Sequence, residues 1–215
     1  MDASDSLIAT LPHARRLALA YAPADARVRM LALLALDVRL AGIVRNSHEP
    51  MLAQLRLAWW REQLQQDGSA WPTGEPLLAA LRSWGGGHAA LAVLADGWEG
   101  MAGAAPLAPA VFDRLAEARA AGFAALADGD AEGRRMGRNW ALVDIAARLS
   151  HPEERAGVLD LAREADWRGA SLPRALRPLA VLHGLSRRAL HRGGNLDRIG
   201  PGDLLAALRI GLIGR

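Results

Sequence analysis

The sequence predicts an all-helical protein, and three features of its composition support this. Alanine and leucine dominate the 215 residues, aromatic residues make up only 5%, and β-branched residues are sparse. This balance favours helix over strand. The eleven prolines are spaced so that several can stand at the start of a helix, where their missing N–H removes no hydrogen bond. A chain of this length suits one domain or two small ones, and we expect a single domain over residues 1–215.

Three of these prolines each precede a predicted helix. Pro12 precedes a helix at 13–20, Pro23 precedes an apolar-rich stretch to about Asn46, and Pro50 precedes a helix at 51–66 that ends at Asp67-Gly68. Beyond a Gly- and Pro-rich loop at 67–75, helices are expected at 76–83, 88–100, 109–127, 131–149, 152–164, 173–191 and 202–213.

Glycines divide the later helices. Residues 85–87 are three consecutive glycines, and these, with Gly129 and Gly133, are interpreted as hinges between helices. The Gly-rich segment 191–202 is predicted to be a linker. A closing or peripheral helix is expected after it, at 203–213.

Composition removes several classes of chemistry. All 26 basic residues are arginine and there is no cysteine, which excludes lysine Schiff bases, a P-loop lysine, disulfides and thiolate chemistry. A net charge of +3, with arginines interleaved among acids, indicates no nucleic-acid partner. The longest strongly apolar run, Met30 to Leu36, is far short of the ~20 residues of a membrane span. With Asp2 and Asp5 in place of a basic leader, we expect a cytoplasmic protein.

The histidines and the spaced acidic pairs do not indicate a metal site. The six histidines (His13, His48, His88, His151, His183 and His191) include no pair four residues apart, so a zinc site is disfavoured and surface or capping roles are expected. No Asp-x-x-x-Asp occurs. The near matches are Asp113 with Glu117, Asp128 with Glu132, and Asp160 with Glu164, which are interpreted as solvated charged faces, the last pair beside Arg163 and Arg168.

The tandem Trp59-Trp60 is the most unusual local feature. Adjacent helical residues point about 100° apart, so the two rings cannot share one face. One apolar row consists of Leu52, Leu55 and Trp59, and a second of Leu57, Trp60 and Leu64, which predicts a broadly buried helix with Arg56 and Arg61 at its margins. Core packing explains the tryptophans; an anion clamp built from the neighbouring arginines is the alternative.

Several segments together resemble the squalene/phytoene synthase family. They are 22–27 (Ala-Pro-Ala-Asp-Ala-Arg), 31–36 (Leu-Ala-Leu-Leu-Ala-Leu) and 49–61 (Glu-Pro-Met-Leu-Ala-Gln-Leu-Arg-Leu-Ala-Trp-Trp-Arg), with a less specific likeness at 137–143 and 172–178. The resemblance implies an isoprenoid-synthase-like helical bundle around a central cavity, shortened in this chain. Active members of the family join two prenyl diphosphates using Mg²⁺ held by two aspartate-rich motifs.

This sequence departs from the family at those motifs. In register, the first motif falls on Ala41, Gly42 and Arg45, and the second falls near residues 148–153, where Arg148 remains and only Glu153 could ligate a metal. Several carboxylates are needed to neutralise and orient clustered Mg²⁺ ions. We therefore expect no metal site, no catalytic residue and no cofactor. The candidate ligand-binding residues are Arg27, Arg45, Arg56, Trp60, Arg148 and Glu153.

The segment from Pro50 to Arg61 resembles in particular the branch that contains the mitochondrial complex I assembly factor and its bacterial relatives. The leading hypothesis is thus a non-catalytic protein that binds a partner protein or a hydrophobic or isoprenoid ligand and assists assembly of a membrane complex, with a peripheral contact to the inner membrane as an option. The alternative is an active, Mg²⁺-dependent head-to-head prenyltransferase with displaced carboxylates such as Asp37, Asp144 or Glu153. The sequence leaves the oligomeric state open.

Overall fold

The computed structural model describes residues 3–47, 49–196 and 198–213, and within these ranges every regular element is helical. This confirms the all-α fold class. His48 lies outside the described residues. The helices are α1 (Ala3–Thr10), α2 (His13–Leu19), α3 (Ala24–Asn46), α4 (Pro50–Gln65), α5 (Pro76–Leu81), α6 (Ala92–Glu99), α7 (Pro109–Ala125), α8 (Ala131–Ala146), α9 (Pro152–Glu164), α10 (Arg177–Leu190) and α11 (Pro201–Ile213), with short 3-10 segments between some of them.

Prolines mark several helix starts as expected, and an acidic residue caps another. Pro12 and Pro23 are the N-cap residues of α2 and α3, and Pro50 is the first residue of α4. Asp130 caps α8 by accepting a hydrogen bond from the Gly133 N–H at 2.6 Å, which satisfies a donor that the first turn leaves open. The expected helices are therefore present within a few residues, and α1 is an additional helix that the sequence reading did not include.

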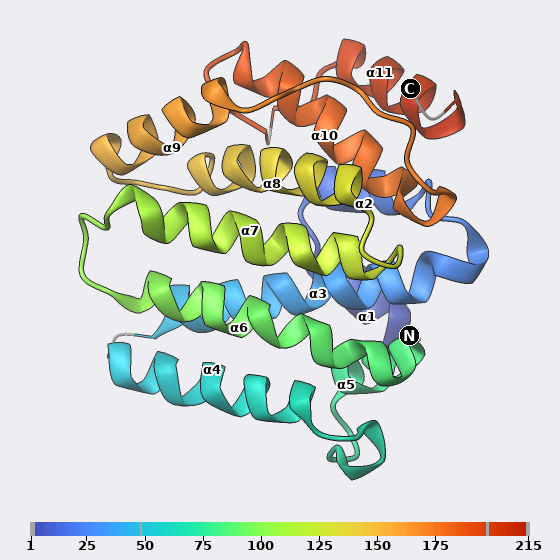
Figure 1. The fold of residues 1–215 in the computed structure, drawn as a ribbon, viewed down its shortest axis with the longest axis vertical. Coiled ribbons are helices and arrows are strands. Elements are labelled where there is room, and N and C mark those ends of the chain that lie inside the picture. The colour runs from blue at the N-terminus through green and yellow to red at the C-terminus, as the bar shows by residue number, and fades with distance from the viewer. Residues whose placement is uncertain (1–2, 48, 197, 214–215) are drawn as a thin grey trace.

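The helices stack side by side in one bundle. In Figure 1, α4, α6, α7, α8 and α10 follow one another from bottom to top, with α3 and α2 behind them. Contacts join α4 to α6, α6 to α7, α7 to α8, and α8 to α9 and α10. Large side chains such as Met30, Phe112 and Trp140 are fully buried between these layers, so one continuous core runs through the stack.

The structure confirms the hinge predicted at the glycine run 85–87 but not the hinge predicted at Gly133. Gly85, with φ 54° and ψ −141°, breaks the 3-10 segment Arg82–Leu91, so the expected hinge in the glycine run is confirmed. Gly133, by contrast, lies in the first turn of α8, where an added Cβ would come within 2.6 Å of Leu176. The hinge prediction for Gly133 is wrong, because this glycine provides close packing and not chain reversal.

One segment, Pro76–Ala102, has the length and mean hydropathy of a membrane-spanning helix. Its backbone is interrupted at Gly85, and Leu91, Leu94 and Trp98 face the core. Its α6 portion packs against both α4 and α7. A core segment of this composition meets the same length and hydropathy test, so the segment is weak evidence for a span.

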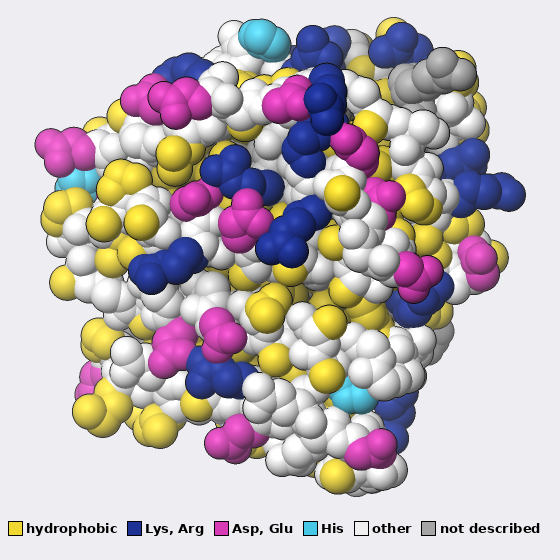
Figure 2. All heavy atoms as spheres, viewed as in Figure 1, with side chains coloured by type: hydrophobic (Ala, Val, Ile, Leu, Met, Phe, Trp, Pro, Cys, Tyr) yellow, Lys and Arg dark blue, Asp and Glu magenta, His cyan; other side chains and the backbone are white. Residues whose placement is uncertain are grey.

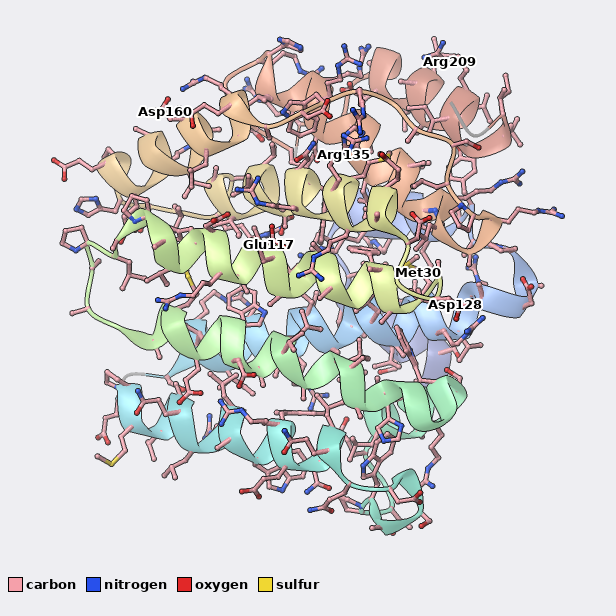
Figure 3. The ribbon with its side chains drawn as sticks, in the orientation of Figure 1. Met30, Glu117, Asp128, Arg135, Asp160 and Arg209 are labelled. Atoms are coloured by element: carbon pink, nitrogen blue, oxygen red, sulfur yellow. The ribbon has the colours of Figure 1, made fainter. Side chains whose placement is uncertain are left out.

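The surface of the front layer carries ion pairs. Arg138 lies 2.6 Å from Asp113 and 3.0 Å from Glu117, and Arg163 pairs with Asp160 at 2.5 Å. Figure 3 shows Glu117 on α7 and Asp160 on α9, and Figure 2 shows acidic and basic side chains mixed over this face. The expectation of solvated charged faces is confirmed for these carboxylates, although Arg168 pairs with Glu132 and Asp166 and not with the acids of α9.

Candidate functional site

Four charged side chains meet in the interior of the bundle and form a closed ring. Arg15 comes from α2, Asp37 from α3, Arg119 from α7 and Asp144 from α8, and each side chain is at most 5% exposed. Arg15 contacts Asp37 at 2.7 Å and Asp144 at 2.8 Å. Arg119 contacts the same two carboxylates at 2.9 and 3.1 Å. We call these four residues the charge ring.

Close helix packing positions the charge ring. An added Cβ at Gly97 of α6 would lie 2.8 Å from Ala118 of α7, and one at Gly137 of α8 would lie 3.1 Å from the Ala120 Cα of α7. An added Cβ would clash at Gly97 and would be tight at Gly137, so α7 lies close to its two neighbours. Arg119, between these two contact positions on α7, is brought within reach of acids on other helices.

Tryptophan rings enclose the charge ring. The Trp98 Nε1–H donates to Asp37 Oδ1 at 2.8 Å. The Arg119 guanidinium lies 5.0 Å from the Trp98 ring centroid and 5.4 Å from that of Trp140, and the Arg15 guanidinium lies 5.0 Å from Trp140. Guanidinium groups stack favourably on aromatic faces, so these rings exclude water and also hold the arginines in place.

Electrostatics favour the charged forms of Arg15, Asp37 and Asp144. Burial alone would raise the pKa of Asp37 and of Asp144, but the adjacent Arg119 and Arg15 outweigh it and lower both pKa values. Burial likewise disfavours the charged form of Arg15, and the two carboxylates reverse this and raise its pKa. Such a paired network is costly to disrupt because removing one partner leaves a buried charge without its counterion.

A small cavity of about 150 Å³ adjoins the charge ring. Its charged lining residues are Arg45, Arg119 and Arg148; the others are apolar: Ala41, Val44, Trp98, Met101, Leu115, Ile145 and Leu149. Arg148 also lies 3.2 Å from Asp144 Oδ1. With Arg15 included, four arginines and two aspartates surround this region, which is therefore electropositive.

The structure brings together some of the sequence-predicted site residues. Arg45 and Arg148 line this cavity together with Ala41, as the register of the two family motifs implies. Glu153 does not join them: it is exposed in the first turn of α9. Its neighbour Glu154 is buried instead and accepts a hydrogen bond from the Leu107 N–H at 2.7 Å.

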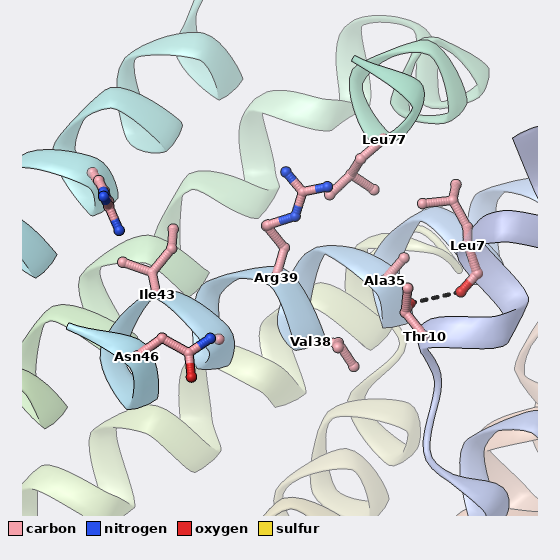
Figure 4. A pocket seen from close by; sticks show the side chains of 10 residues that line it. Leu7, Thr10, Ala35, Val38, Arg39, Ile43, Asn46 and Leu77 are labelled. Atoms are coloured by element: carbon pink, nitrogen blue, oxygen red, sulfur yellow. Dashed lines mark hydrogen bonds between the residues drawn. The ribbon is translucent and has the colours of Figure 1, made fainter.

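The remaining three predicted residues lie elsewhere. Arg27 donates to the Leu19 carbonyl at 2.9 Å, which ties the start of α3 to the end of α2. Arg56 is exposed and borders a separate surface pocket of about 350 Å³, along with Leu7, Thr10, Asn46 and others. Figure 4 shows this pocket, in which the Thr10 hydroxyl donates to the Leu7 carbonyl. Trp60 is buried, 5.6 Å from the Arg39 guanidinium, so it serves the core.

Two expectations about packing are wrong. The row Leu52, Leu55 and Trp59 is 46%, 62% and 40% exposed, so α4 is buried on one face only. The expected surface or capping role also fails for His183, which is buried. His88 is buried too, but its Nε2 lies 2.9 Å from the carbonyl of Gln66, the C-cap residue of α4. A single helix seen in sequence does not reveal how many neighbours cover it, which explains both errors.

Arg15 and Arg119 are the functional-site residues that sequence reasoning missed, and Asp37 and Asp144 were considered only as displaced metal ligands. The available signal was a single charge in an otherwise apolar helical face: Arg119 stands among buried alanines at 116, 118 and 120. A lone arginine in such a face needs a buried acid as its partner. The sequence does not identify that acid, because the partner depends on which helices are in contact.

The residues at this site do not fit a Mg²⁺ cluster. Such clusters need several carboxylate oxygens free to ligate, whereas Asp37 and Asp144 are already bound by arginines. Within the described ranges, no three His, Asp or Glu side chains converge into a group suited to a metal ion.

Comparison with known proteins agrees with the resemblance over the first part of the chain. Residues 13–102 match the family model of squalene/phytoene synthase, which is less than half of the 215 residues. This segment runs from α2 to the end of the 3-10 turn after α6 and supplies Arg15, Asp37 and Trp98 of the site. No curated protein and no solved structure matches the chain.

Proposed function

We propose that this chain is a non-catalytic relative of the squalene/phytoene synthases that binds a hydrophobic ligand with an anionic head, such as an isoprenoid phosphate. The observation that supports this most is the cavity beside the charge ring, where three arginines stand among apolar side chains and no carboxylate lines the wall. Guanidinium groups bind phosphate oxygens in a planar, multi-donor geometry. In place of metal ions, arginines provide the positive charge.

Arg45 is the residue best placed to receive the anion. Arg119 is held by the charge ring and Arg148 by Asp144, whereas Arg45 is exposed and forms no ion pair within the described part of the chain. The neighbouring apolar side chains of Val44, Met101 and Leu149 suit the first carbons of the attached chain. A cavity of about 150 Å³ holds only the head and its first carbons, so the rest of the ligand would lie across the surface.

Calorimetric titration with farnesyl diphosphate in the presence of EDTA tests this proposal. Metal-free binding is expected, with affinity at least about tenfold weaker in Arg45→Gln because a charge-assisted contact is lost. Arg163→Gln, which removes a surface arginine paired with Asp160, serves as the matched control and should bind like the wild type. Equal affinity in Arg45→Gln and wild type would refute the site.

The absence of catalysis is tested separately. With farnesyl or geranylgeranyl diphosphate and Mg²⁺, no condensed product is expected, because the two buried aspartates are neutralised by Arg15 and Arg119. Mg²⁺-dependent turnover that disappears in Asp144→Asn, while circular dichroism stays unchanged, would establish the alternative prenyltransferase function and end the non-catalytic proposal.

Binding of a partner protein is the second candidate, and one observation favours it. Met51, Leu52, Leu55 and Trp59 form an exposed apolar row on α4, inside the segment whose sequence resembles the complex I assembly factor branch. Assistance in assembling a membrane complex would use this row. A stoichiometric complex that survives gel filtration with wild type and is lost in Leu55→Ser/Trp59→Ser would support this candidate; retention of the complex in that variant would rule the row out.

A further inference from the structure

Helix α11 exposes its large apolar side chains and buries small or charged residues, which is the reverse of the usual arrangement in a surface helix. Its buried residues, Asp203, Ala207 and Gly211, are small or charged. Its large apolar side chains point away from the protein: Leu204, Leu205, Leu208, Leu212 and Ile213 are between 48% and 68% exposed. A contiguous exposed apolar face of this kind marks a surface that meets another apolar phase.

The inner face of α11 is firmly attached, so the exposed face is not the result of a loose terminus. The Asp203 carboxylate contacts Arg188 at 2.7 Å and Arg192 at 2.9 Å, with its own side chain only 2% exposed. An added Cβ at Gly211 would meet the Tyr21 ring at 2.1 Å, and one at Gly184 of α10 would meet Ile210 at 2.3 Å. These close contacts fix which side of α11 faces outward.

Charge around α11 identifies the partner surface. Residues 174–215 contain eight arginines and two aspartates, whereas residues 1–173 contain 18 arginines and 21 acidic residues. Basic side chains gather along the upper edge of the molecule in Figure 2, over the region of α10 and α11. Among the residues that the structure describes, Arg209 is the charged residue on the exposed face of α11. Figure 3 places it at the outer edge of the molecule. An anionic surface is thus the electrostatic complement.

We propose that α11 docks on an anionic lipid bilayer, with its leucines inserted at the interface and arginines of α10 and α11 against the headgroups. Helices with an apolar face and flanking arginines bind membranes through buried apolar area together with attraction to acidic lipids. Pairing of α11 with a second copy of the chain fits less well, because it would bring the two Arg209 side chains onto the same apolar face. The inference does not depend on the ligand cavity, which lies among α3, α6, α7 and α8.

Co-sedimentation of the full chain with vesicles tests the proposal. Binding is expected to vesicles of phosphatidylcholine mixed with phosphatidylglycerol, to be much weaker with phosphatidylcholine alone, and to decrease as salt is raised. Leu205→Ser/Leu212→Ser should reduce binding at least about tenfold, since both side chains are more than 60% exposed and would lose their insertion into the bilayer.

Met51→Ser/Leu55→Ser is the matched control, because these residues of α4 are 70% and 62% exposed and lie on another helix. It should bind vesicles like the wild type. Undiminished vesicle binding in Leu205→Ser/Leu212→Ser, or equal binding to neutral and acidic vesicles, would overturn the proposal. So would a wild-type dimer in analytical ultracentrifugation that dissociates in this variant without any vesicle binding, which would assign the face to a second copy.

Discussion

Arg15 contacts Asp144 at 2.8 Å across 129 positions of sequence, and this ion pair joins α2 to α8 in the interior of the bundle. Both residues also belong to the charge ring that includes Asp37 and Arg119. The charge ring holds four helices together. The adjoining cavity, onto which the resemblance places its two motifs, has arginines as its charged lining residues.

Removing one arginine of the charge ring should strongly destabilise the fold. Arg119→Met leaves Asp37 and Asp144 with less compensation in a site from which water is excluded, and a loss of about 3–5 kcal/mol is expected. Urea denaturation measures it. Arg163→Met, which breaks the exposed pair with Asp160, should change stability by less than about 1 kcal/mol. A similar small loss in Arg119→Met would show that the ring carries no net stabilisation.

His183 should make the fold sensitive to mild acid. Burial lowers its pKa, nearby Arg135 and Arg187 lower it further, Asp166 opposes them, and the result is a pKa of about 4 in place of 6.5. The unfolded chain therefore takes up a proton below pH 6.5 that the folded chain takes up only near pH 4. Stability is complete above pH 6.5 and falls as the pH decreases towards 4, by roughly 3 kcal/mol.

The comparison with His183→Leu isolates this effect. Urea midpoints at pH 7, 5.5 and 4.5 should decline more steeply for the wild type than for the variant, because the variant lacks the titrating group. Parallel declines for the two proteins would mean that His183 does not titrate differently in the folded and unfolded states.

Substitution of the two tryptophans of α4 should have very different effects on the free energy of unfolding. Trp60 is 3% exposed and Trp59 is 40% exposed, with their rings edge to face at 5.1 Å. Trp60→Ala opens a cavity in the core and is expected to cost about 3–5 kcal/mol in free energy of unfolding. Trp59→Ala loses a half-exposed surface and should cost clearly less, as thermal denaturation of both variants would show. Equal losses would contradict the observed burial.

Glycine-to-alanine changes at two helical positions should change the stability of the fold in opposite directions. Gly211→Ala places a Cβ 2.1 Å from the Tyr21 ring, so α11 must shift, at a cost of about 1–3 kcal/mol and with faster proteolysis of the C-terminal segment. Gly42→Ala in α3 meets nothing within 4 Å and should stabilise the chain by about 0.5–1 kcal/mol through helix propensity. Denaturation and limited proteolysis check both; a neutral Gly211→Ala would indicate that α11 is not held at this contact.

The sequence by itself determined the helical class, the positions of the helices after α1 and the absence of acids at Ala41, Gly42 and Arg45, where the resemblance places its first motif. These properties are local: proline at a helix start, alanine and leucine content, and the identity of a residue at a given position all act within a few turns of chain. Register alone also indicated that Arg45 and Arg148 would lie near one cavity, as they do.

Only the tertiary structure decided which charges are paired and which apolar faces are covered. Arg15 and Arg119 have their acid partners on other helices, between 22 and 129 positions away in sequence, and no periodicity encodes that distance. The leucines of α11 and the row at Leu52, Leu55 and Trp59 have the composition of core residues, yet they face outward. Burial depends on the number of neighbouring helices, and that number is a property of the assembled bundle, not of any one segment.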